Sequence, residues 1–243
     1  MREETTVVHS GLHPERFQGA VNPPVFHAST ILSQTVEEYR RKRKDWIGEV
    51  PGTYYGRFGT PTIEALSEAI ATLEGGHRCV LYPSGLAACA GALLAFLSAG
   101  DHLLVSDSVY GPTRNLARGL LKRFGVSTTF FDPLLGRGIE SLIQSNTRVI
   151  YLESPGSLTF EVQDVPAMAE IARRRGITTV IDNTWATPLY FKPLARGRCF
   201  GAIGHQVHRR TFRRDARRDY LHQRGLAEAE EFDLRVGTDG GAG

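Results

Sequence analysis

The sequence has 243 residues, of which 41% are hydrophobic and 23% charged, enough for one large α/β domain or two small domains. Its formal net charge of +3 is too small to indicate binding to nucleic acid or to an acidic membrane surface. The three cysteines form neither a metal-spaced pair nor a disulfide framework, and the charged N-terminus lacks an apolar signal core. No apolar run reaches the length of a membrane span. We therefore expect a soluble cytoplasmic protein with no bound metal and no membrane partner.

Residues 1–50 are expected to form an arm and a helix, and a turn-rich link follows them. From Thr62 onward, helical and strand patterns alternate, and the strands are short, nearly continuous apolar runs. This alternation is typical of an α/β domain whose mostly parallel sheet has helices on both faces, and we assign that domain to residues 51–197. The expected strands span 78–83, 102–107, 126–131, 147–155 and 177–184.

The first of these strands leads into a turn that can bind a ligand. Parallel sheets bind ligands beyond the carboxyl ends of their strands. Ser84 and Gly85 form a tight turn here at the start of an apolar helix, where free main-chain N–H groups can hold a phosphate. A simple helix cap at Ser84 explains the same residues without a ligand.

Two further residues, Asp182 and Tyr110, follow strands of the expected sheet. Burying the Asp182 carboxylate is costly unless a positive group accompanies it. The ring nitrogen of pyridoxal phosphate is one such group, and a loop cap is the alternative. The Tyr110 ring can stack on a flat cofactor or pack into the core.

Two residues of the loop YYGRFGTPT, Tyr55 and Arg57, are also candidates. The planar guanidinium group of arginine suits a phosphate because it makes paired, charge-assisted hydrogen bonds. A solvated surface residue is the alternative interpretation of Arg57.

Taken together and in order, these motifs resemble the cysteine and methionine metabolism family of pyridoxal-phosphate enzymes. The resemblance spans residues 5–197 and is carried by YYGRFGTPT, YPSGLAA, DSVYGPT, YLESPGSLTFEVQDVPA and VIDNTWATPLYFKPL. It implies the large domain of the aspartate-aminotransferase type, incomplete at its C-terminal end. ESPGSLTFEVQDVP and DNTWATP are most similar to the β-lyases of the family, which cleave cystathionine to homocysteine, pyruvate and ammonia in methionine biosynthesis. Ser157 stands where the γ-lyases have asparagine, which also favours a β-lyase.

The resemblance implies contacts between the chain and pyridoxal 5'-phosphate. Tyr55 and Arg57 would reach the phosphate of a neighbouring subunit, so the active site would require at least a dimer, with a small amino acid as substrate. The turn of Ser84 and the N–H groups of Gly85 and Leu86 would bind the cofactor phosphate. The Tyr110 ring would stack on the pyridine ring, Asp182 would bind the ring nitrogen, and Thr184 would lie beneath the ring.

One expected catalytic residue is missing from the sequence. The family's reaction requires a lysine that binds the cofactor covalently and moves a proton, in a run resembling S-x-T-K-Y shortly after FKPL. The only lysines of this chain are Lys42, Lys44, Lys122 and Lys192, and Lys192 belongs to FKPL itself. We therefore expect this chain to be inactive.

A shift of reading frame explains the missing lysine. If translation starts at the second base of the Gly197 codon, codons that fit residues 198–215 also encode VDVSVQSATKYIGGHSDV, with the lysine codon straddling Gln206 and Val207. Residues 225–243 likewise decode to a family-like segment. We hypothesise that the frame slips near Gly197 and that residues 198–243 form a non-native, disordered tail without a sustained apolar face.

Two other functions remain open. A lyase-like scaffold without catalysis is one. Nonspecific nucleic-acid binding through the tail is the other, because residues 205–224 contain seven arginines and two acids. The tail lacks regularly spaced aromatic residues and a recognisable reading motif, so we expect no specific nucleic-acid partner.

Overall fold

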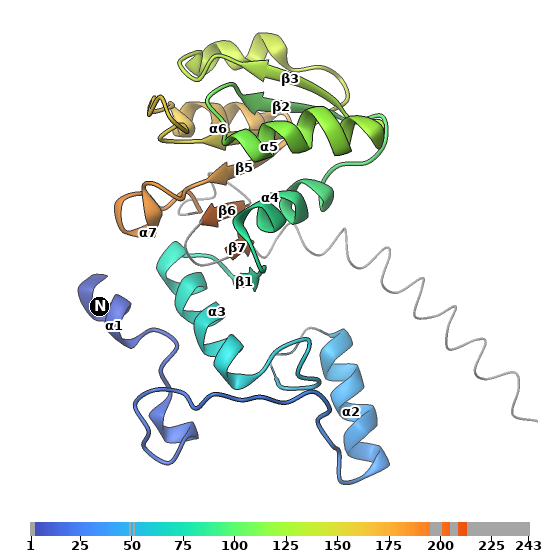
Figure 1. Ribbon diagram of the computed structural model, residues 1–243, viewed down its shortest axis with the longest axis vertical. Coiled ribbons are helices and arrows are strands. Elements are labelled where there is room, and N and C mark those ends of the chain that lie inside the picture. The colour runs from blue at the N-terminus through green and yellow to red at the C-terminus, as the bar shows by residue number, and fades with distance from the viewer. Residues whose placement is uncertain (1–2, 49, 51, 195–200, 205–208, 213–243) are drawn as a thin grey trace, which may run out of the picture. The chain divides into compact units, whose positions relative to one another are not determined.

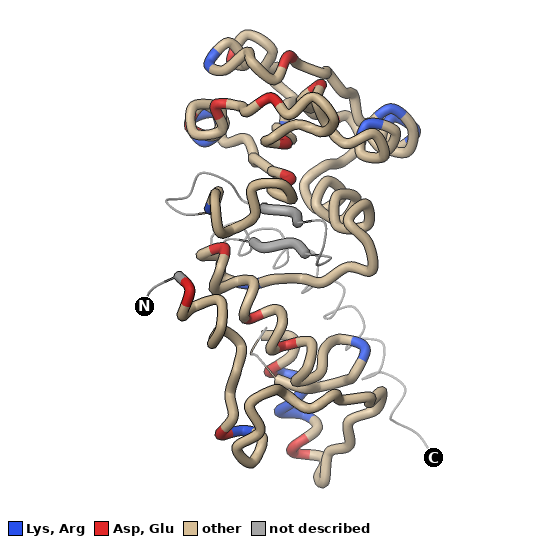
Figure 2. Tube along the Cα trace, turned by 60° about the vertical axis from the view of Figure 1, so that its left-hand side comes forward, with Lys and Arg blue, Asp and Glu red and all other residues tan. Residues whose placement is uncertain are grey.

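The computed structural model describes residues 3–48, 50, 52–194, 201–204 and 209–212 (Figure 1). The chain divides into two compact units, Met1–Leu73 and Glu74–Gly243. Charged positions of both signs occur along the Cα trace of each unit (Figure 2). Within the described ranges, no helix combines the length and the apolar character needed to cross a membrane.

The first unit is mainly helical. Its helices are α1 (Glu3–His9), the 3-10 turn η1 (Pro14–Arg16), α2 (Val36–Ile47) and most of α3 (Pro61–Glu74). The Thr35 hydroxyl caps α2 by accepting from the Glu38 N–H at 3.1 Å, and the Glu38 carboxylate accepts from the Gln34 N–H at 2.7 Å. This reciprocal pair is a capping box, which explains why the helix starts here.

The second unit contains a seven-stranded sheet in the order β1-β7-β6-β5-β4-β2-β3. Strands β2 to β6 pair in parallel, and β7 pairs antiparallel with both β6 and β1. The parallel sheet expected from the alternating pattern is confirmed. The strands are β1 (Arg78–Leu81), β2 (His102–Ser106), β3 (Ser127–Phe131), β4 (Thr147–Glu153), β5 (Thr178–Asp182), β6 (Gly201–Gly204) and β7 (Arg209–Phe212).

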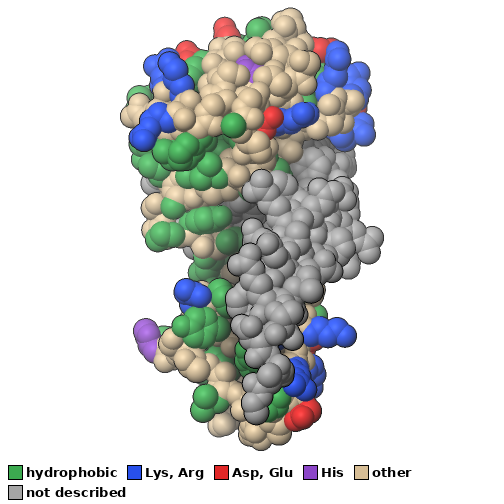
Figure 3. Space-filling model, turned by 90° about the vertical axis from the view of Figure 1, so that its right-hand side faces the viewer, with side chains coloured by type: hydrophobic (Ala, Val, Ile, Leu, Met, Phe, Trp, Pro, Cys, Tyr) green, Lys and Arg blue, Asp and Glu red, His purple; other side chains and the backbone are tan. Residues whose placement is uncertain are grey.

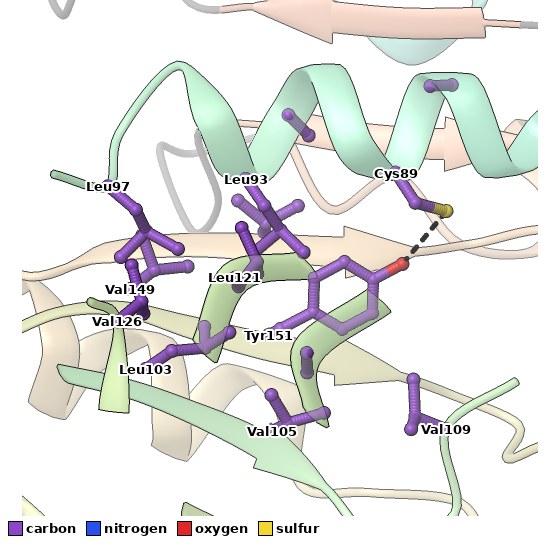
Figure 4. Packing of buried hydrophobic residues seen from close by; sticks show 14 residues of the cluster. Cys89, Leu93, Leu97, Leu103, Val105, Val109, Leu121, Val126, Val149 and Tyr151 are labelled. Carbon is purple, nitrogen blue, oxygen red and sulfur yellow. Dashed lines mark hydrogen bonds between the residues drawn. The ribbon is translucent and has the colours of Figure 1, made fainter. Parts of the chain in front are cut away.

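Helices cover both faces of this sheet, as the continuous apolar strands predict (Figure 1). Successive residues of β4 alternate between the faces: Tyr151 belongs to one core cluster, whereas Ile150 and Leu152 belong to the other. The first cluster lies under α4 (Gly85–Leu94) and α5 (Gly111–Leu116), and Figure 4 shows its packing around Tyr151. The second lies under α6 (Val165–Arg174).

Three helical segments differ in detail from the sequence pattern. The helix expected after Tyr110 consists of α5 and a π-helical segment, η2 (Ala117–Leu121). The segment expected to be helical near residue 140 is a 3-10 helix, η3 (Gly136–Leu142). A short helix, α7 (Thr187–Tyr190), follows β5. Local patterns predict that these segments turn, but not how tightly they are wound.

The largest difference lies after Gly197, where we expected no regular structure. Strands β6 and β7 fall inside this stretch, so eight backbone positions have regular structure, and the expectation of a disordered tail stays a prediction. The physical reason is that the edges of β5 and β1 each present a row of N–H and C=O groups, and main-chain pairing depends little on which side chains the partner carries. The other residues of the expected tail lie outside the described residues.

Some large hydrophobic side chains reach the surface. Figure 3 shows such side chains on one face of the molecule. In the second unit, Leu158, Trp185 and Tyr190 are exposed, and the Phe160 ring lies edge-on to the Trp185 ring at 5.0 Å between centroids. All four follow the carboxyl ends of β4 and β5, the strands that carry the candidate site.

Candidate active site

The turn between β1 and α4 has the form of an anion site. Ser84 caps α4, with its hydroxyl accepting from the Ala87 N–H at 3.1 Å. The N–H of Ala88 donates to the Ser84 carbonyl, which leaves the first two N–H groups of the helix, those of Gly85 and Leu86, without an acceptor among the described residues. Free N–H groups at the positive end of a helix attract phosphate. The helix cap at Ser84 is confirmed. It leaves the N–H groups of Gly85 and Leu86 available, so the phosphate site at this turn stays a prediction.

Asp182, the last residue of β5, is buried at the same edge of the sheet, with 5% of its surface exposed. Its Oδ1 atom accepts from the Thr184 N–H at 3.0 Å and also from the Thr184 hydroxyl. The two hydrogen bonds fix the carboxylate and turn the chain after the strand. Thr184 is thus a direct neighbour of Asp182.

Glu153 is a site residue that the sequence interpretation missed. It ends β4, it is Cα partner to Asp182 in the β4–β5 register, and only 4% of its surface is exposed. Burial raises the pKa of its carboxyl group to about 8, with the negative charge of Asp182 as the second cause. Its position, an acid at the end of an apolar strand just as Asp182 is, was a signal that could have identified it.

Tyr110 joins this arrangement through its main chain. Its N–H donates to Glu153 Oε2 at 2.7 Å, and Tyr110 is the residue before α5, with its side chain half-buried. Hydrogen bonds and strand pairing therefore connect Tyr110, Glu153, Asp182 and Thr184 in one continuous group. The expectation that strand ends bring Tyr110 and Asp182 to one edge agrees with this geometry.

A thiol and a phenol lie on the same face, deeper in the core. The Tyr151 hydroxyl donates to Cys89 Sγ at 3.3 Å, as Figure 4 shows. Burial, with the negative charge of Asp182 as the second cause, raises the pKa of the Cys89 thiol to about 11. Burial also raises the pKa of Tyr151. Both groups remain neutral at physiological pH, so they pack as part of the core and do not supply a nucleophile.

The loop after β4 is tied to the turn that carries Tyr110. The Ser157 N–H donates to the Ser108 carbonyl at 2.7 Å, and the Gln163 amide donates to Ser106 Oγ at 2.6 Å and to the Glu153 carbonyl at 2.8 Å. Gly156 lies so close to Ser108 that a Cβ added to Gly156 would be 2.5 Å from the Ser108 Cβ. These hydrogen bonds and the close contact at Gly156 hold the end of β4 against the end of β2.

Tyr55 and Arg57 belong to the other unit. The Arg57 guanidinium lies over the rings of Tyr55 and Phe58, 5.4 and 5.2 Å from their centroids. The Tyr55 hydroxyl accepts from Ser29 Oγ at 3.3 Å. Arg57 itself is exposed, so its charge is available to an anion. Their expected role at the phosphate of a neighbouring subunit stays a prediction.

The residues of the second unit fit pyridoxal phosphate at both ends of that molecule. The free N–H groups of Gly85 and Leu86 suit the phosphate. At the strand ends, two buried carboxyl groups lie side by side, and the raised pKa of Glu153 shows that negative charge is unfavourable there. A cation such as a protonated ring nitrogen relieves this repulsion.

Known proteins of similar sequence include lyases and a racemase. The chain is 43% identical over 229 residues to a Rhizobium johnstonii protein provisionally named a cystathionine beta-lyase, covering 94% of this chain and 55% of that protein. It is 42% identical over 204 residues to the L-alanine/L-glutamate racemase of Wolbachia pipientis, covering 81% and 50%. It is 41% identical over 194 residues to the cystathionine beta-lyase of Salmonella typhimurium, covering 79% and 48%. The chain thus spans about half the length of these relatives.

Solved structures share the fold. The structure of metB from Corynebacterium glutamicum matches with a TM-score of 0.80 at 25% identity, covering 93% of this chain and 59% of that one. The cystathionine gamma-lyase of Lactobacillus plantarum, complexed with L-serine, matches with a TM-score of 0.78 at 30% identity, covering 89% and 56%. These matches confirm the expected fold class.

The family model described as Cys/Met metabolism PLP-dependent enzyme matches residues 4–199. That match ends two residues after Gly197, whereas the alignment with the Rhizobium protein continues beyond it, because it covers 94% of the chain. The matched segment contains every residue of the candidate site. The chain belongs to the Cys/Met metabolism family of pyridoxal-phosphate-dependent enzymes.

Proposed function

We propose that this chain is part of a carbon–sulfur β-lyase that cleaves cystathionine to homocysteine, pyruvate and ammonia. The observation that carries the proposal is the continuous group of Thr184, Asp182, Glu153 and Tyr110 beside the free N–H groups of α4. The identity to a cystathionine beta-lyase of Salmonella typhimurium supports the choice of substrate.

Each residue of the group has a role in the proposed reaction. Pyridoxal phosphate, when bound, withdraws electrons from the α-carbon of an amino acid and so weakens its C–H bond. Asp182 holds the proton on the ring nitrogen, and Thr184 keeps the Asp182 carboxylate oriented. Gly85 and Leu86 bind the phosphate through their N–H groups, and the Tyr110 ring packs against the cofactor. The elimination then breaks the β-carbon–sulfur bond, and the thiolate leaves with a proton.

A lysine near the end of β6 would complete the site. The β5–β6 register pairs Asp182 with Ile203, and β6 ends at Gly204. The lysine codon of the shifted frame straddles Gln206 and Val207, directly after this strand end. Because β5 and β6 are parallel, Asp182 and Gly204 end their strands at the same edge of the sheet, and the shifted lysine codon follows Gly204 closely in the sequence. This order along the chain supports the hypothesis that the frame slips near Gly197. We propose that the chain as written is not catalytic, for lack of this lysine.

The decisive experiment compares the chain as written with the product of a gene whose frame is corrected at codon 197. The corrected protein should bind pyridoxal phosphate covalently and release pyruvate and a thiol from cystathionine, and the chain as written should do neither. Its Asp182→Asn variant should keep the fold and lose most of the activity. A folded, frame-corrected protein that releases no pyruvate from cystathionine would refute the proposal.

The Wolbachia relative favours a second candidate, amino-acid racemisation, because this chain is 42% identical to an L-alanine/L-glutamate racemase. Both reactions begin with removal of the α-proton, and they differ in whether a β-substituent leaves. Incubating the frame-corrected protein with L-alanine and L-glutamate, and measuring the D-isomers, separates the two. Formation of D-isomers without thiol release from cystathionine would select the racemase.

We also propose that the active form is a homo-oligomer of at least two subunits. Arg57 and Tyr55 lie together on an exposed loop and are suited to a phosphate. If they complete the site of a neighbouring subunit, an Arg57→Ala protein mixed with an Asp182→Asn protein, both frame-corrected, should recover part of the activity that each lacks alone. Unmixed proteins serve as the control, and the absence of recovery would contradict a shared site.

A further inference from the structure

The pairing of Glu153 with Asp182 suggests a role for Glu153 beyond structure. The two residues are direct partners in the β4–β5 register, so their side chains leave neighbouring strands at the same level. Two residues earlier on each strand, Tyr151 and Val180 belong to the same core cluster, so both carboxyl groups face the side covered by α4 and α5. Both are almost completely buried.

The surroundings of Glu153 favour a neutral carboxyl group. The titratable groups that face it are Asp182 from β5, Cys89 from α4 and Tyr151 from its own strand, and none of these is a cation. The Tyr110 N–H, from the turn after β2, donates to its Oε2 atom. Among the described residues, no lysine, arginine or histidine offsets the charge of Glu153. Burial of Glu153 is the first cause that favours its protonated form and the neighbouring charge of Asp182 is the second, so Glu153 keeps its proton.

We propose that Glu153 is a positioning residue that holds the Tyr110 main chain as a neutral acid and releases its proton when a cation binds beside Asp182. The inference rests on the proposed function, because that function supplies the cation, a protonated pyridine ring. Before the cation binds, Asp182 is a carboxylate and Glu153 is neutral. After it binds, both residues are carboxylates beside the cation. The proton of Glu153 leaves to solvent, and no other bond changes.

The proposal predicts a pH dependence of the folded chain alone. The unfolded chain loses the Glu153 proton near pH 4.5, whereas the folded chain keeps it up to about pH 8. The folded state therefore binds more protons in this window, and stability falls as the pH rises through it. In Glu153→Gln, which keeps a carbonyl oxygen for the Tyr110 N–H, this fall is absent. Glu140→Gln is the matched control, because Glu140 is exposed and its hydrogen bond with Arg175 lowers its pKa.

The proposal also predicts a pH dependence of ligand binding. Pyridoxine 5'-phosphate is a suitable probe, because it has the same ring and phosphate but no aldehyde, so it binds without a lysine. The ratio of wild-type to Glu153→Gln affinity should be lower at pH 6 than at pH 8. The rise should approach about tenfold for each unit by which the bound cation lowers the Glu153 pKa. Glu153→Ala should bind the probe more weakly at every pH, since the Tyr110 N–H loses its acceptor.

The two measurements, denaturation of the ligand-free chain from pH 5 to 8.5 and equilibrium binding of pyridoxine 5'-phosphate, give distinguishable failures. A stability difference between wild type and Glu153→Gln that does not change with pH would overturn the inference and leave the proposed function standing. An affinity ratio that is constant with pH would overturn it as well. If neither protein binds the probe, the inference is overturned, whereas the proposed function is refuted only by a folded, frame-corrected protein that releases no pyruvate from cystathionine. The inference and the proposed function are both supported if, as the pH rises, the stability of the wild type falls relative to Glu153→Gln and the ratio of wild-type to Glu153→Gln affinity rises.

Discussion

Replacing Gly156 by alanine should separate the loop after β4 from the turn that carries Tyr110. The added Cβ would be 2.5 Å from both Cβ and Oγ of Ser108, a distance that real Cβ atoms do not tolerate. The backbone has little room to retreat, because the Gly156 N–H donates to the Glu161 carbonyl at 2.9 Å and the Ser157 N–H donates to the Ser108 carbonyl at 2.7 Å. Overpacking of this kind costs about 1–3 kcal/mol in free energy of unfolding.

Urea denaturation followed by circular dichroism measures this cost. With a denaturant slope of about 1–3 kcal/mol per molar, the midpoint of Gly156→Ala should fall by about 1 M. Gly119→Ala is the matched control, since a Cβ at Gly119 would meet nothing within 4 Å, and its midpoint should stay equal or rise. Adding Ser108→Gly to Gly156→Ala removes the clashing atoms and should restore part of the loss. A Gly156→Ala midpoint equal to that of the wild type would refute the reasoning.

Three further predictions concern the site and the core. Ser84→Ala should cost about 0.5–2 kcal/mol in free energy of unfolding, and Ser84→Gly only a few tenths, because the hydroxyl caps α4; equal losses in the two variants would contradict the cap. The Cys89 thiol, whose pKa burial raises to about 11, should stay unmodified by a thiol reagent at pH 8 until the chain unfolds, and peptide mapping should find half-buried Cys79 labelled before Cys89. Met168→Ala should cost about 2–5 kcal/mol on denaturation because Met168 is completely buried, and a loss below 1 kcal/mol would argue against this packing.

The parallel sheet could be predicted from the sequence because its strands are buried on both faces. Strand β2 has an apolar run at residues 103–105, at its centre, and is buried at every position. A short apolar run between two helical patterns favours a central parallel strand. Asp182 and Tyr110 could be placed at one edge for the same reason, since all carboxyl ends of such strands meet there.

The burial of Glu153 beside Asp182 and the pairing of the last strands could not be predicted in this way. Glutamate at the end of a strand usually starts a solvated loop, and only the register with Asp182 shows that Glu153 is buried beside another acid. Strands β6 and β7 carry glycines and arginines in place of an apolar pattern. Their pairing follows from the open edges of distant strands, which a local pattern does not contain.

The place of β1 in the sheet has a consequence for biosynthesis. Among the strands that the structure describes, β1 pairs only with β7, through Arg78 to Phe212 and Leu81 to Arg209, more than a hundred residues apart along the chain. While the chain emerges from a ribosome, β2 to β5 can assemble as soon as each is made, but β1 waits without a neighbour until β7 has left the exit tunnel. Contacts between such distant residues form slowly, because a long loop must close first. The turn at the start of α4, which we propose as the phosphate site, is therefore among the earliest parts of this unit to be synthesised and among the last to be fixed in place.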